Sequence, residues 1–143
     1  VADLLKLEEE RGLYGHDVYI RFAEQVRAVR RDLLAKVLEI KAAGQTLCGI
    51  GCPGRSSTLL NYVGLDSDLM TYIAEQPTSL KLGLFLPGRH IPIVNEKRMF
   101  DEQPDYAIML SWHYAEPIIR KLRKKGLKSK VILPLPNVTV SAF

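Results

Sequence analysis

The chain has 143 residues, 47% of them hydrophobic and 25% charged, as in one soluble globular domain. Such a chain can bury a core without disulfides or metal. The net charge of +4 is mild, and the basic run over 120–130 has no interleaved aromatic residues, which gives nucleic-acid binding little support. No apolar run approaches the roughly 20 residues that span a bilayer, and no signal peptide is visible, so we expect a cytoplasmic protein without membrane contact.

The two cysteines, Cys48 and Cys52, are too close in the sequence to close a long loop. No cysteine or histidine partners accompany them at zinc spacing. We therefore interpret them as small apolar residues at the end of a strand and in a turn, and we expect no metal site. Free thiols also fit a reducing, cytoplasmic setting.

The first third predicts a long helix over 17–43, with Asp17 as its N-cap and Gly44 as its stop. At 1.5 Å per residue this helix would be about 40 Å long, which exceeds what a small domain needs. One end is therefore expected to pack on something outside this chain. The prediction rests on apolar residues that recur every three or four positions, namely Val18, Phe22, Val26, Val29, Leu33, Val37 and Ile40.

The rest of the chain alternates between strand and helix patterns. Strands are predicted over 46–50, 70–74, 105–110 and 130–133, and helices over 56–63 and 114–125. The Gly- and Pro-rich segment 81–92 predicts a long loop of the kind that carries a site or an interface. The alternation predicts an α/β, Rossmann-like, doubly wound and mainly parallel sheet in residues 46–143, preceded by a helical segment over 1–45.

A glycine-rich turn follows the first predicted strand. Gly49, Gly51 and Gly54 match G-x-G-x-x-G between a strand and a helix, which is the context that the motif requires. Glycines there let backbone N–H groups approach an anion at a helix N-terminus. Glu75 ends the next strand about twenty residues later, where an acid often binds a ribose hydroxyl. The alternative is that the turn only packs the helix closely on the strand.

Three residues of the turn extend this interpretation. Pro53 has the fixed φ that suits a first helical turn, Arg55 adds a positive charge, and Ser56 adds a hydroxyl at the same helix end. Leu47 stands two residues before the first glycine, where Rossmann domains that bind S-adenosylmethionine usually carry an acid. The turn is therefore not a convincing S-adenosylmethionine site.

Further candidates lie outside the turn. Asn61 either braces the loop after its helix or contacts a ligand. In the long loop, Arg89 is a candidate for an anionic substrate group, and His90 either ties the loop to a strand or serves as a site group near physiological pH. Trp112 and His113 follow the strongest strand, and they would lie beside the glycine turn if the two strands are neighbours.

Four segments together go beyond a fold type: GIGCPGRSSTLLNYVG over 49–64, LFLPGRHIPIV over 84–94, PDYAIMLSWH over 104–113 and VILPLP over 131–136. In order and spacing they resemble the C-terminal domain of S-adenosylmethionine-dependent C-methyltransferases, of which the best known methylate nucleotide-linked deoxysugars. Sugar-nucleotide members usually carry a lysine soon after the turn's proline, and Arg55 stands in that region here. Arginine can still meet a phosphate, with bidentate geometry.

The resemblance implies a division of labour. In that family a zinc-binding lobe and a central domain, which holds S-adenosylmethionine and the acid/base residues, precede a Rossmann-like domain that closes over the sugar nucleotide. This chain would supply the third part, binding a nucleotide-linked substrate. S-adenosylmethionine would be bound by an upstream methyltransferase domain absent from this chain. The fragment alone would then hold no cofactor and no catalytic residue, and would be inactive.

Two other functions fit the same residues. A nicotinamide-dependent oxidoreductase fragment is permitted by the glycine turn and Glu75, although no clear hydride-transfer acid accompanies them. The second alternative is a non-enzymatic packing module, in which the long helix forms the interface of a homodimer.

Overall fold

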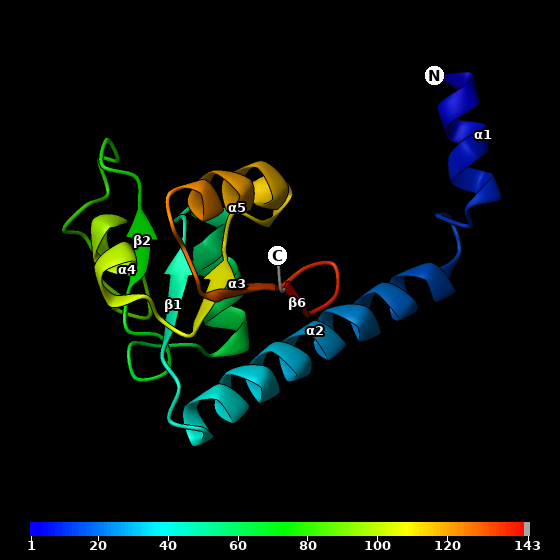
Figure 1. Ribbon diagram of the computed structural model, residues 1–143. Helices are drawn as coiled ribbons and strands as arrows, with labels where there is room; N and C mark the ends of the chain where they lie inside the picture. Colours follow the sequence, from blue (N-terminus) through cyan, green and yellow to red (C-terminus); the bar gives the residue numbers. More distant parts are fainter. Residues whose placement is uncertain (142–143) are drawn as a thin grey trace.

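Six strands form one sheet in the order β3-β2-β1-β4-β5-β6 in the computed structural model, which describes residues 1–141 (Figure 1). All neighbours pair in parallel except β5 and β6, which are antiparallel. This confirms the predicted α/β, mainly parallel sheet. The strands are β1 (Leu47–Ile50), β2 (Ile73–Glu75), β3 (Ile93–Asn95), β4 (Tyr106–Met109), β5 (Lys130–Leu133) and β6 (Thr139–Ser141).

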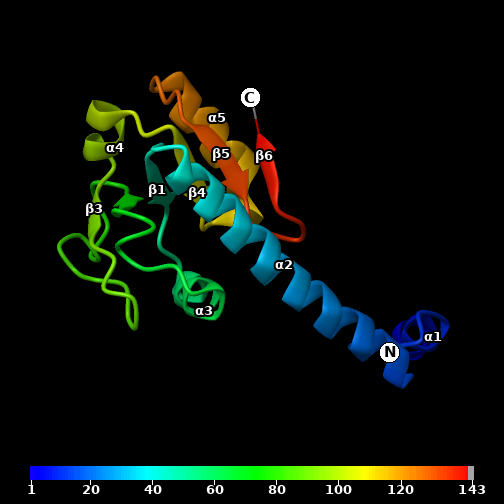
Figure 2. The same cartoon turned by 90° about the horizontal axis from the view of Figure 1, so that it is seen from below.

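Helices cover both faces of the sheet, as Figures 1 and 2 show from two directions. Helices α2 and α3 pack on one face, and α4 and α5 pack on the other. A short 3₁₀ turn, η1, precedes α5 directly. The helices are α1 (Ala2–Glu10), α2 (His16–Ala42), α3 (Gly54–Val63), α4 (Lys97–Glu102), η1 (Trp112–Tyr114) and α5 (Ala115–Lys124).

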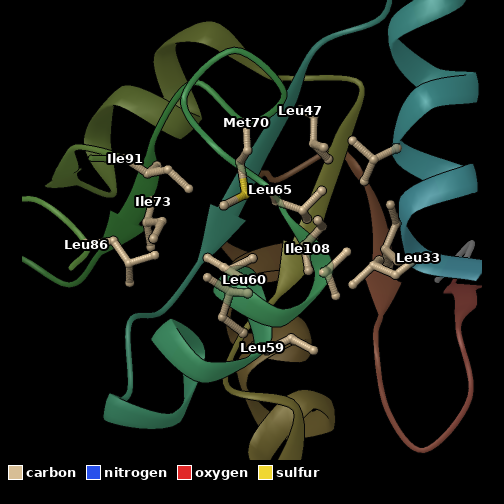
Figure 3. Packing of buried hydrophobic residues seen from close by; sticks show 14 of the residues in the cluster. Leu33, Leu47, Leu59, Leu60, Leu65, Met70, Ile73, Leu86, Ile91 and Ile108 are labelled. Atoms are coloured by element: carbon tan, nitrogen blue, oxygen red, sulfur yellow. The ribbon is translucent and has the colours of Figure 1, made fainter. Parts of the chain in front are cut away.

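Alternation along the strands sorts the core into two layers. Tyr106 and Ile108 of β4 face the α2/α3 layer, whereas Ala107 and Met109 face the α4/α5 layer. Because both faces are covered, the central strands are apolar throughout. Figure 3 shows the α2/α3 layer, in which Leu33 of α2 meets strand and α3 side chains.

Helix α2 ends as its sequence predicts but begins differently. Gly44 has a φ of +69°, and its N–H donates to Lys41 while that of Gln45 donates to Ile40, which closes the helix. The prediction of Asp17 as N-cap is wrong, because Gly15 holds the extended cap conformation and Asp17 lies inside the first turn. An acid there still favours the helix through its dipole.

Four elements have no predicted counterpart: α1, β3, α4 and β6. The last three span three to six residues, which is too short for a periodic pattern to stand out. The predicted loop over 81–92 lies within the connection between β2 and β3. Its buried side chains Leu86 and Ile91 join the α2/α3 layer (Figure 3), so a loop covers the sheet where a crossover helix would otherwise lie.

Candidate functional site at the carboxyl edge of the sheet

The order of the strands places a topological switch between β1 and β4. The chain leaves β1 toward α3 on one face and leaves β4 toward α5 on the other, and ligands of doubly wound sheets bind at such a point. The glycine turn follows β1, and Ser111 to His113 follow β4. The predicted nearness of Trp112 to the turn is confirmed, since the Arg55 guanidinium carbon lies 5.9 Å from the Trp112 ring centroid.

The three glycines of the turn have different surroundings. A Cβ on Gly49 would lie 3.0 Å from the Leu110 side chain, so this glycine allows close packing. Gly51 has a φ of +74°, and a Cβ there would lie 2.4 Å from the Ser111 hydroxyl oxygen. A Cβ on Gly54 would meet nothing within 4 Å. Packing thus explains the first two glycines, whereas the third borders open space.

The middle of the turn is held by two side chains of this domain. The Cys52 N–H donates to Glu75 Oε1 at 2.6 Å, and the Lys81 ammonium donates to the Cys52 carbonyl. Glu75, the predicted ribose ligand, therefore stabilises the turn itself through one oxygen. No hydrogen bond to its second oxygen occurs within residues 1–141.

Ser56 faces the interior. Its side chain is fully buried, and its hydroxyl donates to the Pro53 carbonyl at 2.6 Å. Pro53 is the N-cap of α3 and supplies no side-chain hydrogen bond, so the first N–H groups of α3 have no side-chain acceptor. Pro53 and Ser56 thus shape the helix end, and the N–H groups and Arg55 are what this end presents outward.

Trp112 and His113 form a tilted pair with ring centroids 5.2 Å apart. A hollow of about 930 Å³ is bordered by this pair together with Arg120, Arg123 and Lys124 of α5. A second hollow of about 500 Å³ is bordered by the same pair together with Phe22 and neighbouring side chains of α2. A nucleotide-sized ligand needs a cleft of about 300–1,000 Å³, so the larger hollow has sufficient volume.

A smaller crevice of about 220 Å³ lies between the ends of β1, β2 and β4 and helix α5. Gly51 and Glu75 border it, together with Gln76, Ser111 and Lys121, which the sequence patterns do not single out. Gln76 and Ser111 could have been found from their places directly beyond β2 and β4. Lys121 could not, because its pattern is that of any basic residue on a surface helix.

Asn61, Arg89 and His90 lie elsewhere, at the far end of α3. The Asn61 amide donates to the Pro87 carbonyl at 3.0 Å, and Arg89 donates to the Asn61 carbonyl at 2.8 Å. The backbone N–H of His90 donates to the Leu86 carbonyl. Asn61 therefore braces the loop, and it lies seven steps along helix α3, about 10 Å, from the turn at Gly54.

Burial raises the pKa of both cysteine thiols, that of Cys48 to about 12, and both residues are free and buried. Neutral thiols are poor nucleophiles, so these residues serve packing. Across residues 1–141 we find no cluster of three or more histidine, cysteine, aspartate or glutamate side chains that could hold a metal. Within the same residues, no helix combines the length and apolarity that crossing a membrane requires.

Comparison with known proteins agrees with the resemblance that the four segments suggest. Residues 1–136 match the C-methyltransferase C-terminal domain family. The chain is 33% identical over 142 residues to the C-methyltransferase NovU of Streptomyces niveus, an alignment that covers 98% of this chain and 33% of NovU. The chain thus spans about a third of the length of that relative. It belongs to the C-methyltransferase C-terminal domain family.

Proposed function

We propose that this domain binds the nucleotide-linked substrate of an S-adenosylmethionine-dependent C-methyltransferase. The observation that carries the proposal is the open N-terminus of α3 beside Arg55 and Trp112. Unpaired N–H groups, a helix dipole and a guanidinium together favour a phosphate. The aromatic face of Trp112 and the adjacent hollow suit the base or sugar of the same ligand.

Arg55 is the best-placed phosphate ligand. Its side chain is exposed, and it makes no hydrogen bond or ion pair within residues 1–141. A guanidinium has five donors in a planar fork, which matches two oxygens of one phosphate. Arg89, the other predicted anion ligand, already donates to the Asn61 carbonyl. The substrate's phosphates are therefore assigned to Arg55 and the turn at Gly51 and Gly54.

The methyl donor is assigned to a different domain. Leu47 is buried where an S-adenosylmethionine site would need an acid, and Glu75 already accepts the Cys52 N–H. The full-length enzyme would bind S-adenosylmethionine upstream, hold the catalytic residues there, and use this domain to hold the acceptor. The chain alone would then bind substrate without transferring a methyl group.

Titration of the chain with nucleoside-diphosphate sugars tests this proposal. Trp112 is the only tryptophan, so its fluorescence reports directly on the site, and calorimetry gives the affinity. Arg55→Ala should raise Kd about tenfold, the loss of about 1.4 kcal/mol expected for a charged hydrogen bond. Arg31→Ala, which removes an exposed arginine of α2, should leave Kd unchanged.

Two outcomes would count against the proposal. The first is the absence of heat and of any fluorescence change with every nucleotide sugar tried. The second is binding that Arg55→Ala does not weaken. Tight binding of NADH in the same assay would instead favour the oxidoreductase interpretation, and binding of S-adenosylmethionine would move the methyl donor into this domain.

A further inference from the structure

The N-terminal part of the chain extends away from the sheet. In Figures 1 and 2, α1 and the first half of α2 project beyond the layers formed by the other helices. Helix α1 has no buried residue, and the first buried residue of α2 is Val29. Residues 1–28 therefore contribute no fully buried side chain to the core.

This projecting part of the chain, residues 1–28, carries many large apolar side chains. Phe22 is 64% exposed and Tyr14 is 67% exposed. Such a density of exposed apolar residues marks an interaction surface. The other exposed large hydrophobic residues of this part are Val1, Leu4, Leu5, Leu7, Leu13, Tyr19 and Ile20.

The pattern along α2 is continuous although its burial is not. Val29, Leu33, Val37 and Ile40 are buried, and Val18, Phe22 and Val26 repeat the same spacing toward the N-terminus. We call the second set the apolar stripe. A helix turns about 100° per residue, so both sets lie along one side of α2. Phe22 is exposed and Val18 and Val26 are half-buried, so the stripe has the spacing of a core-facing side but is only partly covered.

We propose that the apolar stripe, together with α1, is the docking surface for the catalytic methyltransferase domain of the same polypeptide. The inference rests on the proposed function in taking this domain to be part of a longer enzyme. The family is a C-terminal domain, and two thirds of the length of NovU lies outside the alignment. A domain that precedes this one in the chain joins it through α1, at the edge of the stripe.

The tether also favours this occupant over a second copy. A domain linked through a short segment is present at an effective concentration in the millimolar range. A second copy of the protein competes only at its own concentration, which is far lower in a dilute solution. An apolar surface beside the point of attachment is therefore covered first by the attached domain.

The stripe is also continuous with the candidate site. The hollow of about 500 Å³ is bordered by Phe22 and Val26 of the stripe and by Trp112 and His113. A domain seated on the stripe would thus border the Trp112–His113 pair. Docking at this surface would bring the catalytic domain to the place where the substrate is proposed to bind.

The experiment uses the full-length enzyme and measures deuterium uptake over residues 16–28. We expect protection of this segment in the full-length enzyme that is absent from the chain 1–143. Phe22→Lys should remove the protection and lower methyl transfer at least about tenfold. Val18→Lys, one turn farther from Trp112, should do the same. Glu24→Lys places the same residue on the opposite side of α2 and should leave both measurements unchanged.

Three results would overturn the proposal. One is equal uptake over 16–28 in the full-length enzyme and the isolated chain. Another is protection that survives both lysine variants of the stripe. The third is a dimer of full-length enzyme, seen by sedimentation, that Val18→Lys dissociates, because a second copy would then cover the stripe. Nucleotide titration of the isolated chain is independent of these results, so failure of the proposed function is distinguishable from failure of docking.

Discussion

An arginine lies at each end of helix α3, and the two arginines differ in their hydrogen bonds. At its N-terminal end, Arg55 has no hydrogen-bond partner within residues 1–141 and stands over the Trp112 ring. At its C-terminal end, Arg89 donates to the Asn61 carbonyl, and Asn61 braces the loop at Pro87. Among the described residues, the guanidinium of Arg55 thus keeps its N–H donors free for a ligand, whereas that of Arg89 donates to the protein itself. An arginine in a predicted site is therefore a ligand candidate only if the fold leaves its donors free.

The largest effect is expected from Gly51→Ala at the open end. The alanine must take a φ near +74° and place its Cβ 2.4 Å from the Ser111 hydroxyl oxygen, so two costs of about 1–3 kcal/mol each combine. Chemical denaturation should show a loss of at least about 2 kcal/mol. Adding Ser111→Ala should restore the part due to the contact with the hydroxyl. Unchanged stability would mean that the turn can relax.

At the braced end, Asn61→Ala is expected to have a smaller effect. It removes the amide that donates to the Ser57 and Pro87 carbonyls, for a loss of about 1–2 kcal/mol. Nucleotide-sugar affinity, measured by Trp112 fluorescence, should stay the same because the brace lies about 10 Å along the helix from the turn. A marked loss of affinity without a matching loss of stability would place Asn61 in the site after all.

A third variant lies at neither end and serves as a reference. Asp105 Oδ2 accepts hydrogen bonds from the Thr46 N–H and hydroxyl, each at 2.8 Å, and these lower the pKa of Asp105. A lowered pKa in the folded state stabilises the fold above the unfolded value of about 3.9, and this contribution is lost as the pH falls below it. Asp105→Asn should flatten the loss of stability with acid below about pH 4, measured by thermal unfolding, and should leave nucleotide affinity unchanged.

The smallest effect on stability is expected from Gly54→Ala, and it separates the two interpretations of the turn most sharply. The added Cβ meets nothing within 4 Å, so stability should stay the same or rise by up to about 1 kcal/mol. If phosphates approach the backbone there, nucleotide-sugar Kd should nevertheless rise. Unchanged affinity would support the interpretation in which the turn only packs helix against strand.

The fold was largely predictable because its central elements carry strong patterns. The run at 106–110 is apolar throughout, as a strand covered on both faces must be, and the glycine spacing located β1 and α3. Strands β3 and β6 have only three residues each, and their pairing depends on neighbours that no local pattern specifies. The prediction of a mainly parallel sheet therefore did not include β6, the antiparallel strand at the edge.

The candidate site was predictable only in part. Trp112 reaches the turn because β1 and β4 are neighbours, which the Rossmann pattern anticipates. The bond between Glu75 and the Cys52 N–H, and that between Arg89 and Asn61, join residues 23 and 28 positions apart. Such bonds depend on where loops settle in three dimensions. A prediction from residue type alone therefore grouped Arg89 and Asn61 with the turn residues in one site. The fold places these two residues at the other end of α3.

The two free thiols sit in different layers of the molecule. Cys48 belongs to the α4/α5 layer, whereas Cys52 belongs to the α2/α3 layer at the start of the glycine turn. Both are buried with raised pKa values, so an alkylating reagent can reach each one only when its own layer opens. The two cysteines therefore act as separate built-in probes, one on each side of the sheet. The alkylation rate of each thiol reports how often its own layer opens.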